Sequence, residues 1–355
     1  MSTAELTEIR GLARDFAAAE LRPHTERWDA DCAVDDDVLS KLAELGFLGM
    51  LVPESAGGMG MDLPTFLAAL EELAWGEAGV AFLVAQSVTA ADTIARLGGD
   101  AARSRLEPLA AGAETACLAL AEDGTDVSAL GTRAERRGDG WVVTGTKAWV
   151  TNGDADTAVV LADTEDGPAL FTVGRDGRTA SERVATLGLR TAPILTVQFD
   201  EAPAERLGAV AGEHSVGDPV GVLAAAAIAV GIAQAALDHA VAYAAEREQF
   251  GRPLRSFEGI QHKLAEMATK TAAARALVER AATRPDDGAA AAMAKLAAGT
   301  CAMFVTTEAV QIFGGSGSTR DYPIKKTMRD AKAMEIVHGT SDVQRLRIAA
   351  SLYSD

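Results

Sequence analysis

Apolar residues recur every three to four positions through the first third of the chain, which is the spacing of one buried face on an α-helix. Four segments show this pattern, at residues 6–22, 37–45, 63–78 and 80–97. The second begins with Asp37, a residue type that caps helices, and stops at Gly46. A glycine-rich connection at residues 52–60 separates it from the third. We therefore predict a helical domain over residues 1–114.

The pattern changes between residues 115 and 212. β-Branched and aromatic residues form short runs bounded by Gly and Asp, at residues 141–150, 158–162, 169–173 and 194–199. No helical pattern separates these runs. They therefore predict a small antiparallel β-domain or barrel.

Long helical patterns return over residues 213–355. They cover residues 220–247, which are rich in alanine, 257–280 and 289–313, and residues 284–288 interrupt them. Helices of this length are typical of a bundle. The chain is thus expected to be mainly α, in the α+β class, with domains at residues 1–114, 115–212 and 213–355.

Composition narrows the class of protein. The chain has 355 residues, 48% of them hydrophobic, and a formal net charge of −18. A compact globular protein is expected, and the negative charge argues against nucleic acid or an anionic membrane as partner. The most apolar run, residues 223–236, is too short to cross a bilayer, and no secretory signal is visible. We expect no membrane association and a cytoplasmic location.

Scattered cysteines and histidines give no metal-ligand spacing, so no metal site is expected. Cys32, Cys117 and Cys301 are interpreted as small buried apolar residues. The most basic window, residues 320–332, is compatible with a solvated helix end or with a local site for a phosphorylated ligand.

Three motifs in the last third of the chain carry candidate chemistry. They are R-E-Q-F-G-R-P-L at residues 247–254, Q-I-F-G-G-S-G at residues 311–317 and H-G-T-S-D-V-Q-R at residues 338–345. The first two follow helical segments, and each alone is compatible with a simple helix-stop turn. Glycines in the second also let backbone N–H groups approach an anionic group closely.

In this order and spacing the motifs resemble the acyl-CoA dehydrogenase family. The resemblance extends upstream through K-L-A-E-L-G-F-L-G at residues 41–49 and T-G-T-K-A-W-V-T-N-G at residues 144–153, and covers nearly all the chain. It implies an N-terminal helical domain, a small middle β-domain and a C-terminal four-helix bundle. It also implies FAD held between subunits of a homodimer or homotetramer.

The resemblance assigns a set of residues to FAD. Trp149 would pack beside the isoalloxazine and Thr151 would hydrogen-bond near its N5, while Arg247 would reach the pyrophosphate of a neighbour's FAD, which its planar fork suits. The full set is Leu118, Ala121, Trp149, Val150, Thr151, Arg247, Gln249, Phe250, Gln311, Gly314, Gly315, Thr340 and Asp342.

The chain departs from the family pattern where the catalytic base is expected. The usual glutamate is replaced by His338, and the alternative position of the base, just before the long helix of the bundle, falls at Gly221. A loop at residues 118–126 is shortened and has Ala121 where a flavin-bonding threonine is common. Thr125 in that loop, and Gly339 after the histidine, are the residues expected to contact substrate.

The resemblance implies FAD-dependent α,β-dehydrogenation of an acyl thioester carried by CoA or an acyl-carrier protein, with electrons passed to an acceptor such as an electron-transfer flavoprotein. His338 is either the base, because neutral imidazole accepts protons near neutrality, or a polar residue lining an altered pocket. Two other functions stay open, a flavin-dependent oxidase or monooxygenase, and a catalytically silent FAD-bearing subunit of a hetero-oligomer.

Overall fold

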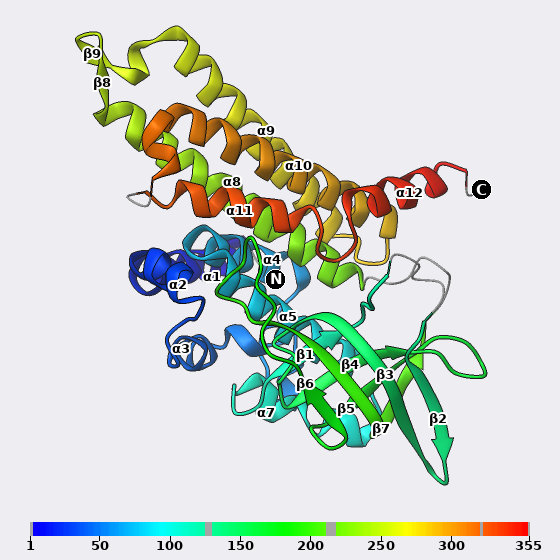
Figure 1. Ribbon diagram of the computed structural model, residues 1–355. Coiled ribbons are helices and arrows are strands. Elements are labelled where there is room, and N and C mark those ends of the chain that lie inside the picture. The colour runs from blue at the N-terminus through cyan, green and yellow to red at the C-terminus, as the bar shows by residue number, and fades with distance from the viewer. Residues whose placement is uncertain (1–2, 125–129, 211–217, 320–321, 354–355) are drawn as a thin grey trace.

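The computed structural model of the chain describes residues 3–124, 130–210, 218–319 and 322–353 (Figure 1). A helical bundle lies above a β-barrel, and the N-terminal helices lie between and beside them. This arrangement matches the order expected from the sequence, with a helical domain, a small β-domain and a C-terminal helical bundle.

The N-terminal region is helical, as predicted. Its α-helices are α1 (Thr3–Phe16), α2 (Thr25–Asp31), α3 (Val38–Glu44), α4 (Leu63–Gly76), α5 (Ala78–Leu97), α6 (Asp100–Arg103) and α7 (Leu106–Ala110). Asp37 precedes α3 but does not cap it, because its carboxylate pairs with Lys41 at 2.9 Å instead. The residue between α4 and α5, Glu77, does act as a cap and accepts a hydrogen bond from the Val80 amide.

A seven-stranded sheet forms the β-domain. Its strands are β1 (Ala116–Ala119), β2 (Arg133–Arg137), β3 (Gly140–Thr151), β4 (Thr157–Ala162), β5 (Ala169–Val173), β6 (Arg178–Ala180) and β7 (Ile194–Ala209), in the order β1-β4-β5-β7-β3-β2 with β6 on β7. The predicted antiparallel pairing is wrong for β1 and β4, which run parallel. Hydrogen bonds from Ala134 N to Asp163 O (2.8 Å) and from Asp163 N to Thr132 O (2.9 Å) join β2 to the end of β4, so the sheet curls into a barrel.

The C-terminal region is a bundle of long helices. It contains α8 (Pro219–Glu246), the short strands β8 (Glu248–Gln249) and β9 (Arg252–Pro253), α9 (Glu258–Ala282), α10 (Gly288–Phe313), α11 (Ile324–Met334) and α12 (Ser341–Ser351). Buried residues of α4, α5 and α8–α11 form one continuous hydrophobic core, whereas the barrel has a core of its own. A side chain at Gly231 would lie 2.3 Å from the Glu71 carbonyl oxygen, so this glycine lets α8 pack closely on α4.

Three helices of the described chain are long and apolar enough, by length and composition alone, to cross a membrane. They are α5, α8 and the segment Gly288–Ser318. The expectation that the apolar run of α8 is too short was wrong, because the helix has 28 residues. Its apolar window is 94% buried inside the protein and that of α5 is 89% buried, so core packing accounts for both. The window in Gly288–Ser318 is only 50% buried, so core packing covers half of it.

The cysteines follow the prediction in two cases of three. Cys117 and Cys301 are buried, and burial raises the pKa of Cys117 to about 12. Cys32 is partly exposed, because it ends α2 in the left-handed conformation with φ of 56°.

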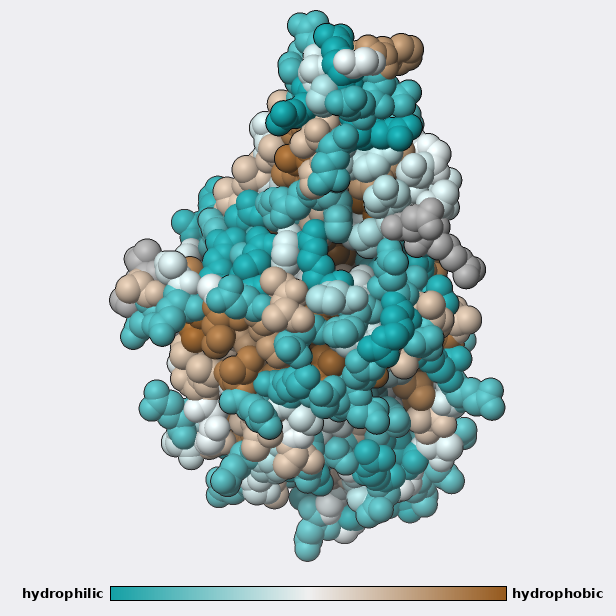
Figure 2. Space-filling view, turned by 90° about the vertical axis from the view of Figure 1, so that its left-hand side faces the viewer, coloured by the Kyte–Doolittle hydropathy of each residue, from teal (hydrophilic) through white to brown (hydrophobic). Residues whose placement is uncertain are grey.

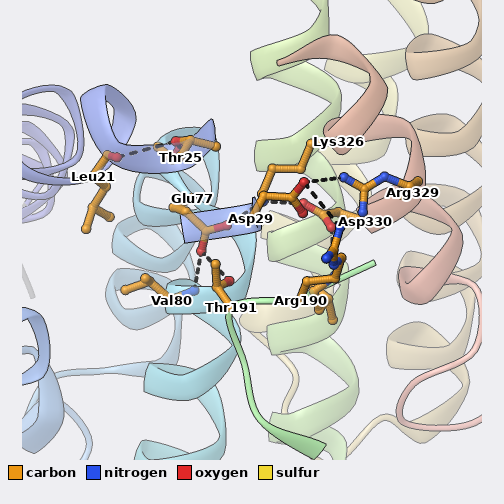
Figure 3. A network of polar contacts seen from close by, with 12 residues as sticks. Leu21, Thr25, Asp29, Glu77, Val80, Arg190, Thr191, Lys326, Arg329 and Asp330 are labelled. Carbon is orange, nitrogen blue, oxygen red and sulfur yellow. Dashed lines mark hydrogen bonds and ion pairs between the residues drawn. The ribbon is translucent and has the colours of Figure 1, made fainter. Parts of the chain in front are cut away.

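A buried ion cluster joins the three regions (Figure 3). Lys326 of α11 contacts Glu77 at the start of α5 and lies 2.6 Å from Asp330 one turn away. Asp330 also accepts a hydrogen bond from the Leu189 amide, and Glu77 one from the Thr191 hydroxyl, which ties in the segment before β7. Although burial opposes it, the two carboxylates hold the pKa of Lys326 above its usual value. The prediction of a solvated helix end is therefore wrong for this lysine.

Removing the cation should be costly. Lys326→Met is expected to lower the free energy of unfolding by about 3–5 kcal/mol, because two buried carboxylates lose the cation that neutralises them. Lys332→Met on the same helix is the control, since Lys332 is half exposed and its pair with Glu335 contributes about 1 kcal/mol at most. Urea unfolding measures both. Equal losses for the two variants would contradict the role given to the cluster.

Candidate active site

His338 lies in a tight turn between α11 and α12. Its φ is 53°, which is unusual for a residue with a side chain, and Gly339 follows at 94°. The turn is held from two sides. Lys295 Nζ donates to the Gly339 carbonyl at 2.6 Å, and Gln344 Nε2 donates to the His338 and Gly339 carbonyls at 3.0 and 3.1 Å. Because Lys295 and Gln344 are buried, these hydrogen bonds fix the backbone of the turn, and the backbone in turn orients the imidazole.

The imidazole ring lies between α5 and the start of α8. Its Nε2 is 2.8 Å from Gln86 Nε2, and its edge meets the ring of Phe82 at a centroid distance of 6.1 Å. A Cβ at Gly221 would lie 2.7 Å from His338 Cε1 and 2.8 Å from Nδ1. The ring therefore occupies the space that the Cβ of any other residue at position 221 would need. The two departures at the base positions are sterically coupled.

Electrostatics keep this histidine neutral. Burial, and then the positive charges of Lys295 and Arg347, lower the pKa of His338 to about 4. Burial likewise lowers the pKa of Lys295 to about 8, so Lys295 is still mostly charged at neutral pH. A pKa of about 4 gives His338 a basicity near that of a free carboxylate, whose reference value is about 4.3 for glutamate. The ring can accept a proton at neutral pH.

The end of β3 presents an aromatic surface. The register of β3 against β7 shifts between Lys147 and Val150, and Trp149 there has a φ of 59° and a side chain 58% exposed. Such a bulge turns a side chain out of the sheet. Val150 and Thr151, which follow Trp149 at the end of β3, are buried. Trp149 thus offers a flat apolar surface to a planar ring, which fits its predicted place beside a flavin.

The shortened loop after β1 is anchored to β3. The Ala121 carbonyl accepts a hydrogen bond from the Ala148 amide at 2.9 Å, and Glu122 accepts one from Lys147 Nζ at 2.7 Å. Although burial opposes it, hydrogen bonds from Lys147, Thr132 and the Gly131 amide lower the pKa of Glu122 to about 2. Leu118 is buried in β1 and Ala121 is exposed. Thr125, the predicted substrate residue, lies outside the described residues.

Thr340 and Asp342 lie at the start of α12, next to His338 in the chain. The Thr340 hydroxyl caps the helix by accepting from the Val343 amide at 3.3 Å. Asp342 is exposed and pairs with Arg345 at 2.7 Å. Both side chains are near the surface, as a role beside a cofactor requires.

The remaining predicted FAD residues lie at the opposite end of the bundle (Figure 1). Arg247 follows α8, and Gln249 and Phe250 belong to the exposed β8–β9 hairpin, in which Phe250 is 92% exposed. Twenty-six positions separate Gly221 from Arg247 along α8, which is about 39 Å at 1.5 Å per residue. Figure 2 shows this end of the bundle as a narrow, mostly hydrophilic extension above a broad body.

The second motif ends α10 beside the hairpin end of α8. Phe313 stacks on Tyr243 of α8 with ring centroids 4.0 Å apart, and this contact places Gln311, Gly314 and Gly315 at the same end of the bundle. A Cβ at either glycine would meet no protein atom within 4 Å. The backbone here is open to a ligand or to another chain. Within one chain the predicted FAD residues at the hairpin end therefore lie apart from Thr340 and Asp342 beside His338, and the structure does not bring these two sets together.

Sequence reasoning missed three residues that hold His338, namely Gln86, Lys295 and Gln344. Two of them carried a signal, because Gln86 and Lys295 are polar residues within strongly apolar helical segments. Buried polar groups need hydrogen-bond partners, so each implied a partner from elsewhere in the chain. The sequence did not show that the partners are the two sides of one turn.

Comparisons with known proteins find matches over nearly the whole chain. Models of the N-terminal, middle and C-terminal domains of acyl-CoA dehydrogenase match residues 3–113, 117–202 and 220–353. The chain is 36% identical to the probable acyl-CoA dehydrogenase YngJ of Bacillus subtilis, covering 99% of this chain and 98% of YngJ.

Two solved structures show the same architecture. One chain comes from the structure of the electron-transferring flavoprotein of Acidaminococcus fermentans, with a TM-score of 0.94, 36% identity, and coverage of 100% of this chain and 99% of that one. The other is a glutaryl-CoA dehydrogenase from Mycobacterium smegmatis in complex with FADH2, with a TM-score of 0.93, 27% identity, and coverage of 100% and 96%.

The steric coupling of His338 and Gly221 predicts a change of sign. Gly221→Ala alone should lower the free energy of unfolding by about 1–3 kcal/mol, because its Cβ collides with the imidazole. In a His338→Ala background the same change should raise it by about 0.5–1 kcal/mol, since alanine favours the helix over glycine. A double-mutant cycle by urea unfolding measures the difference.

Gly11→Ala on α1 is the control, because a Cβ there would meet no atom within 4 Å. It should stabilise the protein equally in both backgrounds. If Gly221→Ala behaves like Gly11→Ala without removal of His338, the imidazole does not lie against Gly221.

Proposed function

The chain belongs to the acyl-CoA dehydrogenase family, and from that premise we propose that it oxidises an acyl thioester to its α,β-unsaturated form with FAD as cofactor. The single observation that supports this function most is the state of His338. A neutral imidazole is held in a rigid turn at the position of the family base, and it can take the α-proton of the substrate.

Several of this chain's residues fit FAD. Bound FAD would supply the two-electron acceptor for the β-hydrogen of the substrate, which leaves as hydride. Exposed Trp149 would pack against the flavin ring and Thr151 would lie at its reacting edge. Asp342 and Thr340 at the start of α12 would lie near the same cofactor. These assignments rest on the family pattern together with the bulge that exposes Trp149.

A homodimer or homotetramer is proposed because the FAD residues at the hairpin end lie far from those beside His338. In this proposal the hairpin end of one copy, with Arg247 and Phe250, reaches the FAD held at the His338 end of another. Gly314 and Gly315, open on the hairpin end, leave room for the cofactor's phosphates.

The substrate is proposed to be a thioester of CoA or of an acyl-carrier protein. The CoA thioester has the stronger support, because relatives named as dehydrogenases of CoA thioesters match 99% or more of this chain. The electrons would pass to a separate acceptor, for which an electron-transfer flavoprotein is the first choice to test.

The main test is anaerobic flavin bleaching. We expect mixing with a panel of acyl-CoA thioesters to bleach the flavin, and His338→Ala to slow bleaching by about 10²–10⁴-fold, the usual contribution of a general base, while FAD stays bound. Because the base must be unprotonated and its pKa is about 4, bleaching should be constant from neutral pH down to about pH 5.5 and fall only below that.

The pH dependence separates His338 from an ordinary exposed histidine. A base with the reference pKa of about 6.5 would lose activity already between pH 7 and 6. No bleaching by any thioester, with turnover driven by oxygen or NAD(P)H instead, would overturn the proposed function. Unchanged bleaching in His338→Ala would remove the histidine from it.

The shared site predicts complementation between two inactive variants. Arg247→Glu and His338→Ala should each be inactive, the first from loss of FAD. Co-expressed, they should recover roughly a quarter of wild-type activity, because random pairing makes half the pairs mixed and each mixed pair has one intact site.

Co-expressed His338→Ala and His338→Gln serve as the control and should stay inactive, since both defects lie in the same half of the site. Bleaching of the purified mixtures measures the recovery. A mixture of Arg247→Glu and His338→Ala without activity, despite proven mixed assembly, would show that the two groups of residues do not meet across copies.

A further inference from the structure

Gln86 is a buried amide in an otherwise apolar stretch of α5. Its residue is 5% exposed, and its neighbours in the helix, among them Phe82, Val84 and Val88, belong to the hydrophobic core. A buried amide without a partner is costly. The hydrogen bond to His338 Nε2 at 2.8 Å is the contact that compensates it.

The amide can serve His338 in two ways, which a half-turn about its Cγ–Cδ bond interchanges. The structure has the amide nitrogen facing the ring, with Gln86 Nε2 2.8 Å from His338 Nε2; if this nitrogen donates, His338 Nε2 is the acceptor and Nδ1 carries the ring proton. If its oxygen accepts, Nε2 carries the proton and Nδ1 keeps a free lone pair. Only the second arrangement leaves a ring nitrogen able to take a proton.

The surroundings of Nδ1 favour the second arrangement. Nδ1 faces the start of α8, since a Cβ at Gly221 would lie 2.8 Å from Nδ1 but 3.6 Å from Nε2. No described residue accepts a hydrogen bond from Nδ1. An N–H there would be left without an acceptor, which is less tolerated than an unused lone pair.

The charged groups around the ring keep it neutral. Lys295 of α10 and Arg347 of α12 are the cations that disfavour the protonated ring, and Glu335 after α11 favours the charged form of Lys295. α5 and α8 contribute the uncharged Gln86 and Gly221. The neutral ring is therefore the resting form, and its tautomer is decided by Gln86.

We propose that Gln86 is a positioning residue, whose amide oxygen accepts from His338 Nε2–H and thereby makes Nδ1 the proton acceptor. This inference rests on the proposed function. As the substrate's α-C–H bond breaks, its proton goes to Nδ1 and its electron pair forms the new C=C bond. The β-hydrogen would leave with its electron pair as hydride, for which bound FAD would supply the acceptor. The resulting imidazolium keeps its Nε2–H on the Gln86 oxygen.

The test uses two substitutions in the FAD-loaded enzyme. Gln86→Leu removes the acceptor and should lower the limiting rate of thioester bleaching roughly tenfold to a hundredfold, as the loss of an orienting partner usually does, with little change in half-saturating thioester. Gln86→Glu keeps an acceptor and adds a negative charge. It should retain the rate at neutral pH and move the acid limb of the pH profile upward by about one unit or more.

Gln234→Leu on α8 is the matched control, because Gln234 is also a partly buried helical glutamine, bound to Arg275 and Asp238 rather than to His338. Its rate and pH profile should equal those of the wild type. FAD content and urea unfolding, measured for every variant, exclude a general loss of structure.

A second readout does not depend on turnover. Solid-state NMR of ¹⁵N-histidine-labelled holoenzyme, with the His338 signals identified by their loss in His338→Gln, should show Nε2 protonated and Nδ1 unprotonated. Gln86→Leu should lose this single tautomer. Nδ1 found protonated in the wild type would overturn the inference.

The outcomes distinguish the inference from the function beneath it. If His338→Ala abolishes bleaching but Gln86→Leu bleaches at the wild-type rate, the positioning role is wrong and the proposed function stands. If no thioester bleaches the wild type, or His338→Ala bleaches normally, the proposed function fails and the inference fails with it.

Discussion

The buried ion cluster of Glu77, Lys326 and Asp330 is the interaction on which the candidate site depends. It fixes the start of α5 and the first turns of α11, and through the Leu189 amide it holds the segment leading into β7. Gln86 lies nine positions after Glu77, and His338 lies four after the end of α11. The helix that carries Gln86 and the helix that precedes His338 are therefore both anchored at this cluster. Buried ion pairs are stabilising only while their geometry is kept, because no water replaces a lost partner. The cluster therefore fixes the positions of α5 and α11 relative to each other.

Departures from a family pattern need not be independent events. His338 and Gly221 are 117 positions apart in the sequence, yet the imidazole lies where a side chain at 221 would begin. A larger residue at either base position leaves no room for the other. The chain thus has one candidate base, His338, whose ring contacts Phe82 and Gln86 and whose turn is held by Lys295. Packing therefore explains why glycine at position 221 accompanies histidine at position 338 in this chain.

Local patterns predicted the helices and most strands because their signals lie within a few residues. The runs over 63–78 and 80–97 became α4 and α5, and the residues 169–173 became β5 without change. The errors arose where distant groups compete. Asp37 pairs with Lys41 instead of capping, Lys326 is drawn into the core by Glu77, and β1 pairs in parallel with β4. The site residues came from motif resemblance, whereas the hydrogen bonds of Gln86 and Lys295 required the fold.

The length of α8 has a thermodynamic consequence. With Arg247 about 39 Å along α8 from Gly221, which lies beside His338, cofactor binding and association of copies become linked equilibria in the assembly proposed above. Each FAD bound would tighten the contact between copies, and each dissociation would release cofactor from two half-sites at once. Flavin content would then depend on protein concentration, and dilution alone would yield colourless enzyme without any change in the chain.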